Sequence, residues 1–198
     1  MIYRTFLFYS LFFIITICLI SSCHYTREEK EIKQMIGRTI LVDGPYLYFD
    51  SSQIYFEKPP QKKINVITCL QASSCYDCMV QPLLAMEMAI NLKCKYYDSI
   101  NIWAIVSKVD IDSLQFSLKK YRIKSVVVVD TTNYFNKVNN LNHLLLTNRT
   151  FIIDKERKIV FVGHPIFRTV LQKQFCLLLD NLCRNQGSLN IKELNGGT

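Results

Sequence analysis

The stretch Ile64–Leu92, with the sequence INVITCLQASSCYDCMVQPLLAMEMAINL, decides the fold. It begins with an apolar run rich in β-branched residues, which predicts a buried strand over Ile64–Leu70. A short polar loop follows and ends in the pair Cys75 and Cys78. The next segment is long and apolar with helical spacing, and it predicts a helix over Cys78–Leu92. The order is therefore strand, loop, Cys-x-x-Cys and helix.

A pair of cysteines at the start of a helix has a chemical use, because unpaired amide N–H groups point outward there. These groups stabilise a thiolate and lower the pKa of the first cysteine, which makes it a nucleophile. The two intervening residues let the second sulfur close a disulfide with little loss of chain entropy. We therefore predict that Cys75 is the attacking thiol and Cys78 the resolving thiol in thiol–disulfide chemistry.

The rest of the chain alternates between strands and helices. Strands are predicted over Ile100–Ser107, Ser125–Val129, Thr150–Ile153 and Lys158–Val162. Helices are predicted over Asp112–Tyr121 and Ile166–Cys183, and a short helix or turn over Thr132–Leu141. Asp110 or Asp112 is the expected N-cap of the first of these helices, and the last two strands are spaced for a hairpin. This order predicts an α/β domain with a mixed central sheet and helices on both faces. The loop after the first strand then lies at the carboxyl end of the sheet, where such domains place their sites.

Residues 1–22 have the features of a signal peptide. Arg4 is their only charged residue, and the apolar run Phe6–Ile20 is shorter than the roughly 20 residues that a membrane span needs. The run ends in Leu-Ile-Ser-Ser-Cys, which resembles a bacterial lipobox. The resemblance implies cleavage before Cys23, diacylation of Cys23, and a lipid anchor on the periplasmic side of the inner or outer membrane. An uncleaved signal anchor, or an ordinary signal peptide followed by a chance cysteine, are the alternatives.

Residues 23–60 form a lead-in whose relation to the domain the sequence leaves open. A charged helix over Thr26–Ile36 is expected to stop at Gly37. Short strands are expected over Thr39–Val42, Pro45–Phe49 and Ile54–Phe56. The domain proper is predicted over residues 61–185, and residues 186–198 are predicted to be a disordered tail.

Composition excludes several classes of protein. The chain has 198 residues and a net charge of +8, but its lysines and arginines are scattered, so a nucleic-acid groove is not expected. Eight cysteines include a single Cys-x-x-Cys, without the second pair or spaced histidines that a zinc site needs. We expect no metal and no cofactor. Buried, inert thiols are predicted at Cys69, Cys94, Cys176 and Cys183.

These pieces together resemble the thioredoxin-like, redoxin-type lipoproteins of bacteroidete bacteria, which are distantly similar to TlpA-type membrane-tethered thiol–disulfide oxidoreductases. The resemblance covers roughly Ile36–Cys183 and rests on the lipobox, on the segment Ser74–Cys78, and on the hairpin motifs TFIIDK and KIVFVG. It implies a thioredoxin-like fold and exchange of disulfides with protein thiols and disulfides of the cell envelope. It also implies a substrate groove formed by Ser74, Tyr76, Asp77, Asn148 and Arg149.

The sequence departs from that family at three places. No proline occurs between Pro82 and Pro165, so Asn148 stands where the family has a cis-proline facing the dithiol. Ser74 stands where a tryptophan often precedes the first cysteine. The helix proline of the family falls one residue early, at Pro82. The first departure bears directly on how a substrate would dock.

Several other functions are alternatives to oxidoreductase activity, and each would need particular residues near the cysteine pair. The main alternative is a redox-inactive binding lipoprotein with a static Cys75–Cys78 pair. A thiol peroxidase would need a threonine where Ala72 stands, and a haem attachment motif would need a histidine directly after Cys78. Copper delivery would need a histidine near the dithiol.

The histidines and the residues inside the motif refine this expectation. His143 is the one candidate copper ligand, because His164 is expected at the far end of the sheet. The residues between the cysteines, Tyr76 and Asp77, bring no positive charge, and Asp77 should disfavour a thiolate. We therefore predict a weakly oxidising, thioredoxin-like reduction potential.

Overall fold

The computed structural model describes residues 27–49, 54–55, 62–70, 75–94, 97–165 and 169–190. The predicted signal peptide, Cys23 and Ser74 lie outside these residues. The chain divides into two compact units, residues 1–34 and 35–198. The described part of the first is helical and holds an ion pair of 3.1 Å between Arg27 and Glu31. No helix in the described ranges has the length and apolar character to cross a membrane.

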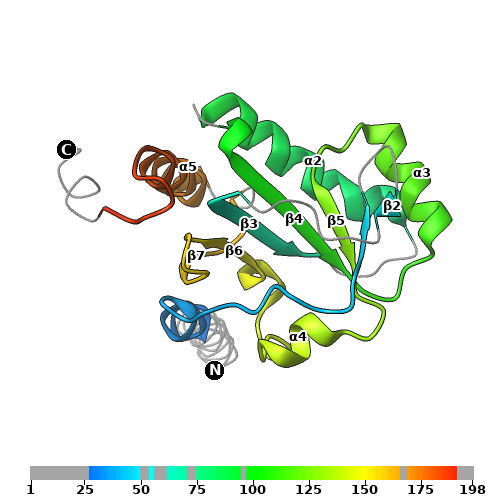
Figure 1. The fold of residues 1–198 in the computed structure, drawn as a ribbon, viewed down its shortest axis with the longest axis horizontal. Coiled ribbons are helices and arrows are strands. Elements are labelled where there is room, and N and C mark those ends of the chain that lie inside the picture. The colour runs from blue at the N-terminus through cyan, green and yellow to red at the C-terminus, as the bar shows by residue number, and fades with distance from the viewer. Residues whose placement is uncertain are drawn as a thin grey trace, which may run out of the picture. The chain divides into compact units, whose positions relative to one another are not determined.

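The second unit is built on one sheet, whose strands among the described residues follow the order β2-β1-β5-β4-β3-β6-β7 (Figure 1). The strands are β1 Leu47–Phe49, β2 Ile54–Tyr55, β3 Ile64–Cys69, β4 Ile100–Val106, β5 Val126–Val129, β6 Thr150–Ile153 and β7 Ile159–Val162. The helices are α2 Tyr76–Lys93, α3 Ile111–Tyr121, α4 Tyr134–Val138 and α5 Thr169–Arg184, with 3₁₀ turns η1 Tyr97–Ser99 and η2 Leu146–Asn148. Every strand and helix predicted between residues 64 and 184 is therefore present.

Strand pairing confirms the predicted mixed sheet. Strands β3, β4 and β5 run parallel, β6 is antiparallel to β3, and β7 is antiparallel to β6. The predicted hairpin of the last two strands is confirmed, and α3 has Asp110 as its N-cap. This arrangement is a thioredoxin-like fold, with the dithiol segment following β3, which lies between β4 and β6 in the sheet.

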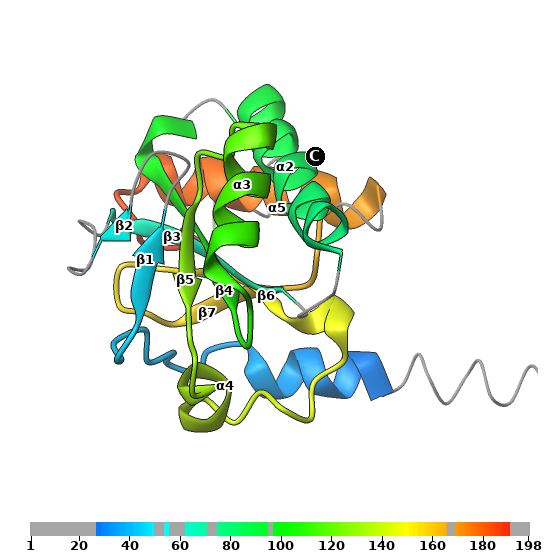
Figure 2. The ribbon, with the colours of Figure 1, turned by 90° about the vertical axis from the view of Figure 1, so that its right-hand side faces the viewer.

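Helices α2, α3 and α5 pack on one face of the sheet, and α4 lies on the other (Figure 2). Alternate strand residues explain this division, because successive side chains of a strand point to opposite faces. Val66 and Ile102 belong to the same core cluster as Leu83 of α2 and Phe175 of α5, and all four are nearly inaccessible to solvent. The predicted helices on both faces are therefore confirmed.

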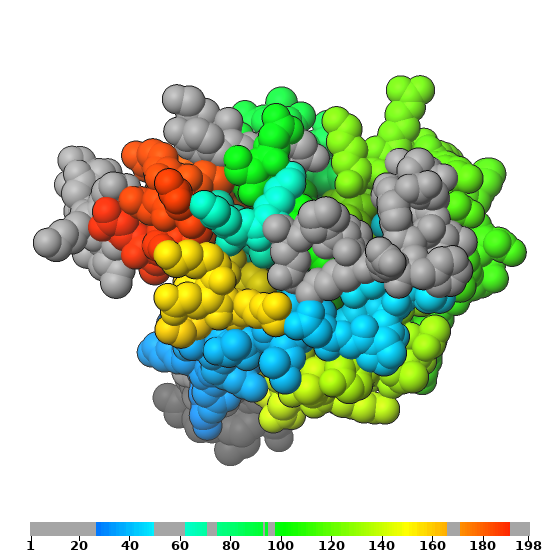
Figure 3. All heavy atoms as spheres, in the orientation of Figure 1, coloured from blue at the N-terminus to red at the C-terminus, as the bar shows by residue number. Residues whose placement is uncertain are grey.

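The lead-in is part of the sheet, which the sequence did not decide. Strand β1 pairs antiparallel with β5, and the ring of Tyr48 packs edge-on against buried Trp103 at a centroid distance of 5.9 Å. Residues 37–40 hydrogen-bond to the β6–β7 hairpin, and Figure 3 shows this segment lying along that hairpin. The predicted strand over Thr39–Val42 is wrong, because the hairpin meets it only in an isolated bridge at Thr39.

The start of the predicted disordered tail is held against the domain. Gly187 donates its N–H to the carbonyl of Leu182 at 2.7 Å and accepts the N–H of Lys155 at 3.0 Å. Its φ of +86° and the 2.9 Å that would separate a Cβ from the carbonyl oxygen of Lys63 both favour glycine. Residues around Gly187 thus contact the domain, residues 191–198 lie outside the described ranges, and the disordered tail stays a prediction.

Candidate functional site

Cys75 and Cys78 form a disulfide at the amino end of α2, with their Cα atoms 5.2 Å apart. Cys75 is the N-cap residue, and its Sγ accepts the backbone N–H of Cys78 at 3.1 Å. The same N–H can also donate to the Cys75 sulfur when Cys75 is a thiolate, because an N-cap side chain normally accepts a hydrogen bond from the first helical turn. The helix terminus therefore favours Cys75 as the sulfur that carries negative charge.

The two sulfurs differ in their surroundings. Cys78 is exposed and Cys75 is half-buried. Cys75 nevertheless lines a surface groove of about 530 Å³, which Cys78 does not. We call it the α2–α3 groove, because Cys75, Tyr76 and Asp77 form one wall and the first turns of α3 form the other. A molecule bound in this groove would meet Cys75.

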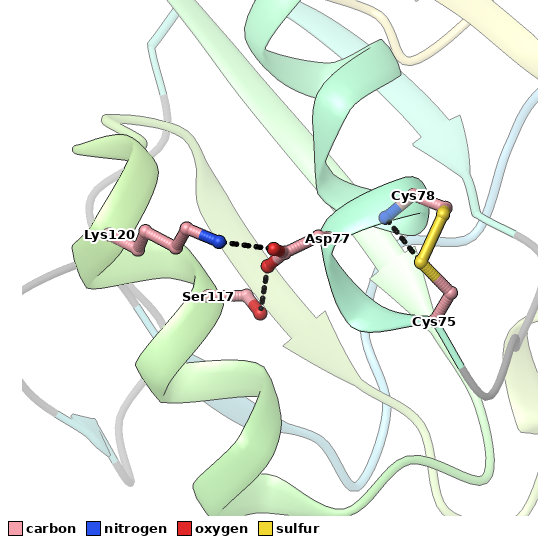
Figure 4. The surroundings of a disulfide bond; sticks show 5 residues. All are labelled: Cys75, Asp77, Cys78, Ser117 and Lys120. Carbon is pink, nitrogen blue, oxygen red and sulfur yellow. Dashed lines mark hydrogen bonds and ion pairs between the residues drawn. A yellow bond between two sulfur atoms is a disulfide. The ribbon is translucent and has the colours of Figure 1, made fainter.

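The first turn of α2 is fastened to α3 by Asp77. The Asp77 carboxylate accepts the hydroxyl of Ser117 at 2.9 Å and pairs with the ammonium group of Lys120 (Figure 4). The hydrogen bond from Lys120, and then the one from Ser117, lower the pKa of Asp77 below its usual range. The carboxylate is therefore ionised beside a paired cation. Lys120 offsets part of this charge, and the effect of Asp77 on a Cys75 thiolate stays a prediction.

A second contact joins the same two helices. The backbone N–H of Asp110 donates to the phenolic oxygen of Tyr76 at 2.7 Å. Tyr76 and Asp77 thus both hold the dithiol turn against α3 and its N-cap residue. Sequence reasoning missed Ser117 and Lys120, which lie 40 and 43 residues from Asp77. No local pattern in the sequence marks contacts at that separation.

Further along, α2 is tied to the start of β5 by a buried carboxylate. Glu87 accepts the backbone N–H groups of Lys124 and Ser125, at 3.0 and 2.6 Å, and the hydroxyl of Ser125. Only 5% of Glu87 is exposed. The helix that carries the dithiol is therefore held at its amino end by Asp77 and in its middle by Glu87.

Two residues of the predicted substrate groove lie at the carboxyl end of β3. The carbonyl of Arg149 accepts the N–H of Cys69, the last residue of β3, at 2.9 Å. The Arg149 guanidinium donates to the carbonyls of Leu144 and Asn142, at 3.2 and 3.3 Å. Asn148 is buried at the end of η2, and no peptide bond in the described ranges is cis. Both residues hold their own loop in shape, and their part in a substrate groove stays a prediction.

His164 does not lie at the far end of the sheet, contrary to expectation. Its backbone N–H donates to the carbonyl of Thr147 at 3.1 Å, next to Asn148. The reason is that β6 starts opposite the end of β3, and β7 brings the chain back to the same edge. Burial lowers the pKa of His164 to about 4. The described residues contain no group of three or more His, Cys, Asp or Glu side chains that could hold a metal ion.

The other described cysteines, Cys69, Cys94, Cys176 and Cys183, are not joined in a disulfide within the described ranges. Burial raises the pKa of Cys69 to about 12 and that of Cys183 to about 11. A hydrogen bond with Cys176, followed by burial, raises the pKa of Cys94. Such thiols carry little thiolate at neutral pH, which sets them apart chemically from the pair at the helix terminus.

No protein-family model matches the sequence, and no curated protein matches it. Solved structures do match. A PrxQ mutant from Xylella fastidiosa is 14% identical with a TM-score of 0.51, over 71% of this chain and 94% of that one. A protein from Aquifex aeolicus VF5, assigned provisionally to electron transfer, is 15% identical with a TM-score of 0.50, over 73% and 97% of the two chains.

A thioredoxin-like protein solved in its oxidised form is 15% identical with a TM-score of 0.43, over 65% of this chain and 84% of that one. At these identities the similarities show the fold alone. The function must therefore be argued from the geometry of the site.

Proposed function

We propose that this chain is a membrane-anchored thiol–disulfide oxidoreductase that exchanges disulfides with protein partners of the cell envelope. The observation that carries the proposal is the position of the Cys75–Cys78 disulfide. It caps the amino end of a helix, it reaches the surface, and it opens onto the α2–α3 groove. A disulfide kept only for stability has no need of such a position.

The reaction runs through a mixed disulfide. In the reduced chain, the Cys75 thiolate attacks one sulfur of the partner's disulfide, and the other partner sulfur leaves as a thiolate that takes a proton from water. Cys78 then loses its proton and attacks the Sγ of Cys75, and the partner's second sulfur leaves. The partner gains two electrons, and the chain returns to the disulfide form. The same steps in reverse oxidise a partner's dithiol.

The surroundings of Cys75 support a moderate reduction potential. Helix-terminal amides stabilise the Cys75 thiolate, but no unpaired cation in the described part of the groove adds to them, because Lys120 is engaged by Asp77. A potential near that of thioredoxin, about −270 mV, is therefore expected, rather than the roughly −120 mV of a strong periplasmic oxidant.

The anchor is proposed from the sequence around Cys23. Labelling of the cells with a radioactive fatty acid tests it: the wild-type chain should carry label, and Cys23→Ala should lose it. Cys18→Ala, a cysteine of the same apolar segment, is the matched control and should keep the label. Equal labelling of Cys23→Ala and the wild type would remove the lipid anchor from the proposal.

A binding protein that keeps a static disulfide is the second candidate, favoured by Asn148 at the position of the family's cis-proline. Trapping of the mixed disulfide separates the two. Cys78→Ser leaves Cys75 able to attack but unable to be released, so this variant should accumulate a covalent adduct with a peptide disulfide. Cys75→Ser should not, and Cys183→Ser should behave as the wild type. Absence of an adduct in Cys78→Ser would favour the binding protein.

A further inference from the structure

The α2–α3 groove lies directly beside the sulfur that the proposed reaction uses. Its second wall consists of two adjacent pairs of residues one helical turn apart on α3, namely Asp112 with Ser113 and Phe116 with Ser117. The first wall carries Cys75 itself. A chain segment lying in the groove would therefore run past the disulfide and along α3 at once.

Phe116 gives the groove an apolar surface that folding does not require. Helix α3 buries Leu114 and Leu118 against the sheet, but 70% of Phe116 is exposed. Exposed aromatic side chains next to a reactive group are typical anchor points for a partner, since they supply contact area at a small cost in entropy. Phe116 thus provides a single exposed aromatic side chain at the edge of the groove.

The charge on the groove is opposite in sign to that of the whole chain. The chain carries +8, yet the groove's carboxylates are Asp77 and Asp112. Lys120 offsets Asp77. Asp112 is exposed, and its carboxylate makes no side-chain hydrogen bond or ion pair among the described residues. A positively charged partner group would therefore be attracted to Asp112, four residues from Phe116 on the same helix face.

We propose that the α2–α3 groove receives the polypeptide segment that flanks a partner's disulfide, with an apolar side chain on Phe116 and a lysine or arginine beside Asp112. This inference rests on the proposed function and names its substrate class: disulfides embedded in basic, partly apolar protein segments. Seating of the segment presents the partner's sulfur to Cys75 and leaves Cys78 outside the groove, free to resolve the mixed disulfide.

The test measures how fast the purified, reduced protein reduces three disulfides. The first is a peptide disulfide flanked by Phe and Lys, the second is its counterpart flanked by Gly and Glu, and the third is hydroxyethyl disulfide, which is too small to fill the groove. Phe116→Ser and Asp112→Asn are the test variants. Leu92→Ser is the matched control, because Leu92 is 77% exposed near the other end of α2.

The Phe-Lys peptide should react several-fold faster than the Gly-Glu peptide in the wild type. Phe116→Ser should lower the second-order rate constant for the Phe-Lys peptide about tenfold, as the loss of an aromatic anchor does elsewhere. Asp112→Asn should reduce the preference for the Phe-Lys peptide about threefold. Both variants should change the rate with hydroxyethyl disulfide much less than the rate with the Phe-Lys peptide. Leu92→Ser should match the wild type with all three disulfides.

Equal rates for both peptides, or an unchanged rate in Phe116→Ser, would overturn the inference while leaving the proposed function in place. Failure of the wild type to reduce hydroxyethyl disulfide would overturn the proposed function instead. The groove would then be tested by binding of the Phe-Lys peptide with serine in place of cysteine. Weaker binding by Phe116→Ser would support the groove, and unchanged binding would refute it.

Discussion

Glu87 is the side chain whose loss should most clearly weaken the attachment of α2, the helix that carries the cysteine pair, to the start of β5. It lies in the middle of α2, is 5% exposed, and accepts two backbone N–H groups and one hydroxyl at the start of β5. Glu87→Ala removes all three acceptor contacts at once. The dithiol and the groove lie outside this contact, so the substitution tests the fold rather than the chemistry.

The size of the effect follows from the number of donors left without an acceptor. A buried donor without a partner costs about 1–3 kcal/mol. The N–H of Lys124 is partly reached by water, so the N–H and hydroxyl of Ser125 dominate, and the free energy of unfolding should fall by about 3–5 kcal/mol. For a domain of this size the melting temperature should fall by roughly 6–20 °C. Glu87→Gln keeps one acceptor oxygen and should lose about half as much.

Unfolding in urea, followed by the fluorescence of the single tryptophan, Trp103, measures this directly, because Trp103 is 3% exposed in the folded domain. Met88→Ala is the control: Met88 neighbours Glu87 but is 54% exposed, so its truncation should change the free energy by less than about 0.5 kcal/mol. A loss of under about 1 kcal/mol in Glu87→Ala would refute the reasoning that these hydrogen bonds hold α2 to β5.

Three further outcomes are expected. Lys120→Met removes the cation paired with the Asp77 carboxylate, so the pKa of Cys75 should rise and alkylation of Cys75 should need a higher pH. Lys119→Met should leave the pH dependence of alkylation unchanged. Burial lowers the folded pKa of His164 to about 4, so the unfolded chain takes up the proton first as the pH falls below about 6.5. Between pH 6.5 and 4, the free energy of unfolding of the wild type should therefore fall by up to about 3 kcal/mol more than that of His164→Gln. Urea titrations at several pH values would measure this difference. The same dependence of the free energy on pH in both proteins would contradict it. In the reduced protein at pH 8, iodoacetamide should modify Cys75 well before Cys69, whose pKa is about 12, and mapping by mass spectrometry would reveal the reverse order if the burial argument fails.

The fold could be predicted because its signals are local. The apolar runs of β3, β4 and β5 are buried strands, and the cysteine pair marks the start of α2 within two residues. The alternation of strands and helices, with a hairpin at the end, then predicted a mixed sheet with helices on both faces. The site could be predicted as far as it lies within the Cys-x-x-Cys segment, because helix-terminal chemistry depends on neighbouring residues alone.

The rest of the site depends on contacts that sequence spacing does not reveal. Lys120 and Ser117 meet Asp77 only because α3 packs beside α2, so the sequence did not reveal the cation paired with Asp77. The predicted position of His164 is wrong because β7 returns the chain to the edge of the sheet at which β6 begins. The groove itself is formed by two helices and has no counterpart in a linear motif.

The measurement that tests the central claim most directly is the redox equilibrium of the Cys75–Cys78 pair, followed by thiol trapping of the purified protein in graded glutathione and dithiothreitol buffers, with Cys75→Ser as the control. The account predicts a reversible two-electron transition near the potential of thioredoxin, about −270 mV, that Cys75→Ser abolishes. A pair that stays oxidised until the protein unfolds, or that never forms a disulfide in solution, would contradict it and would leave a domain that uses this fold only to bind.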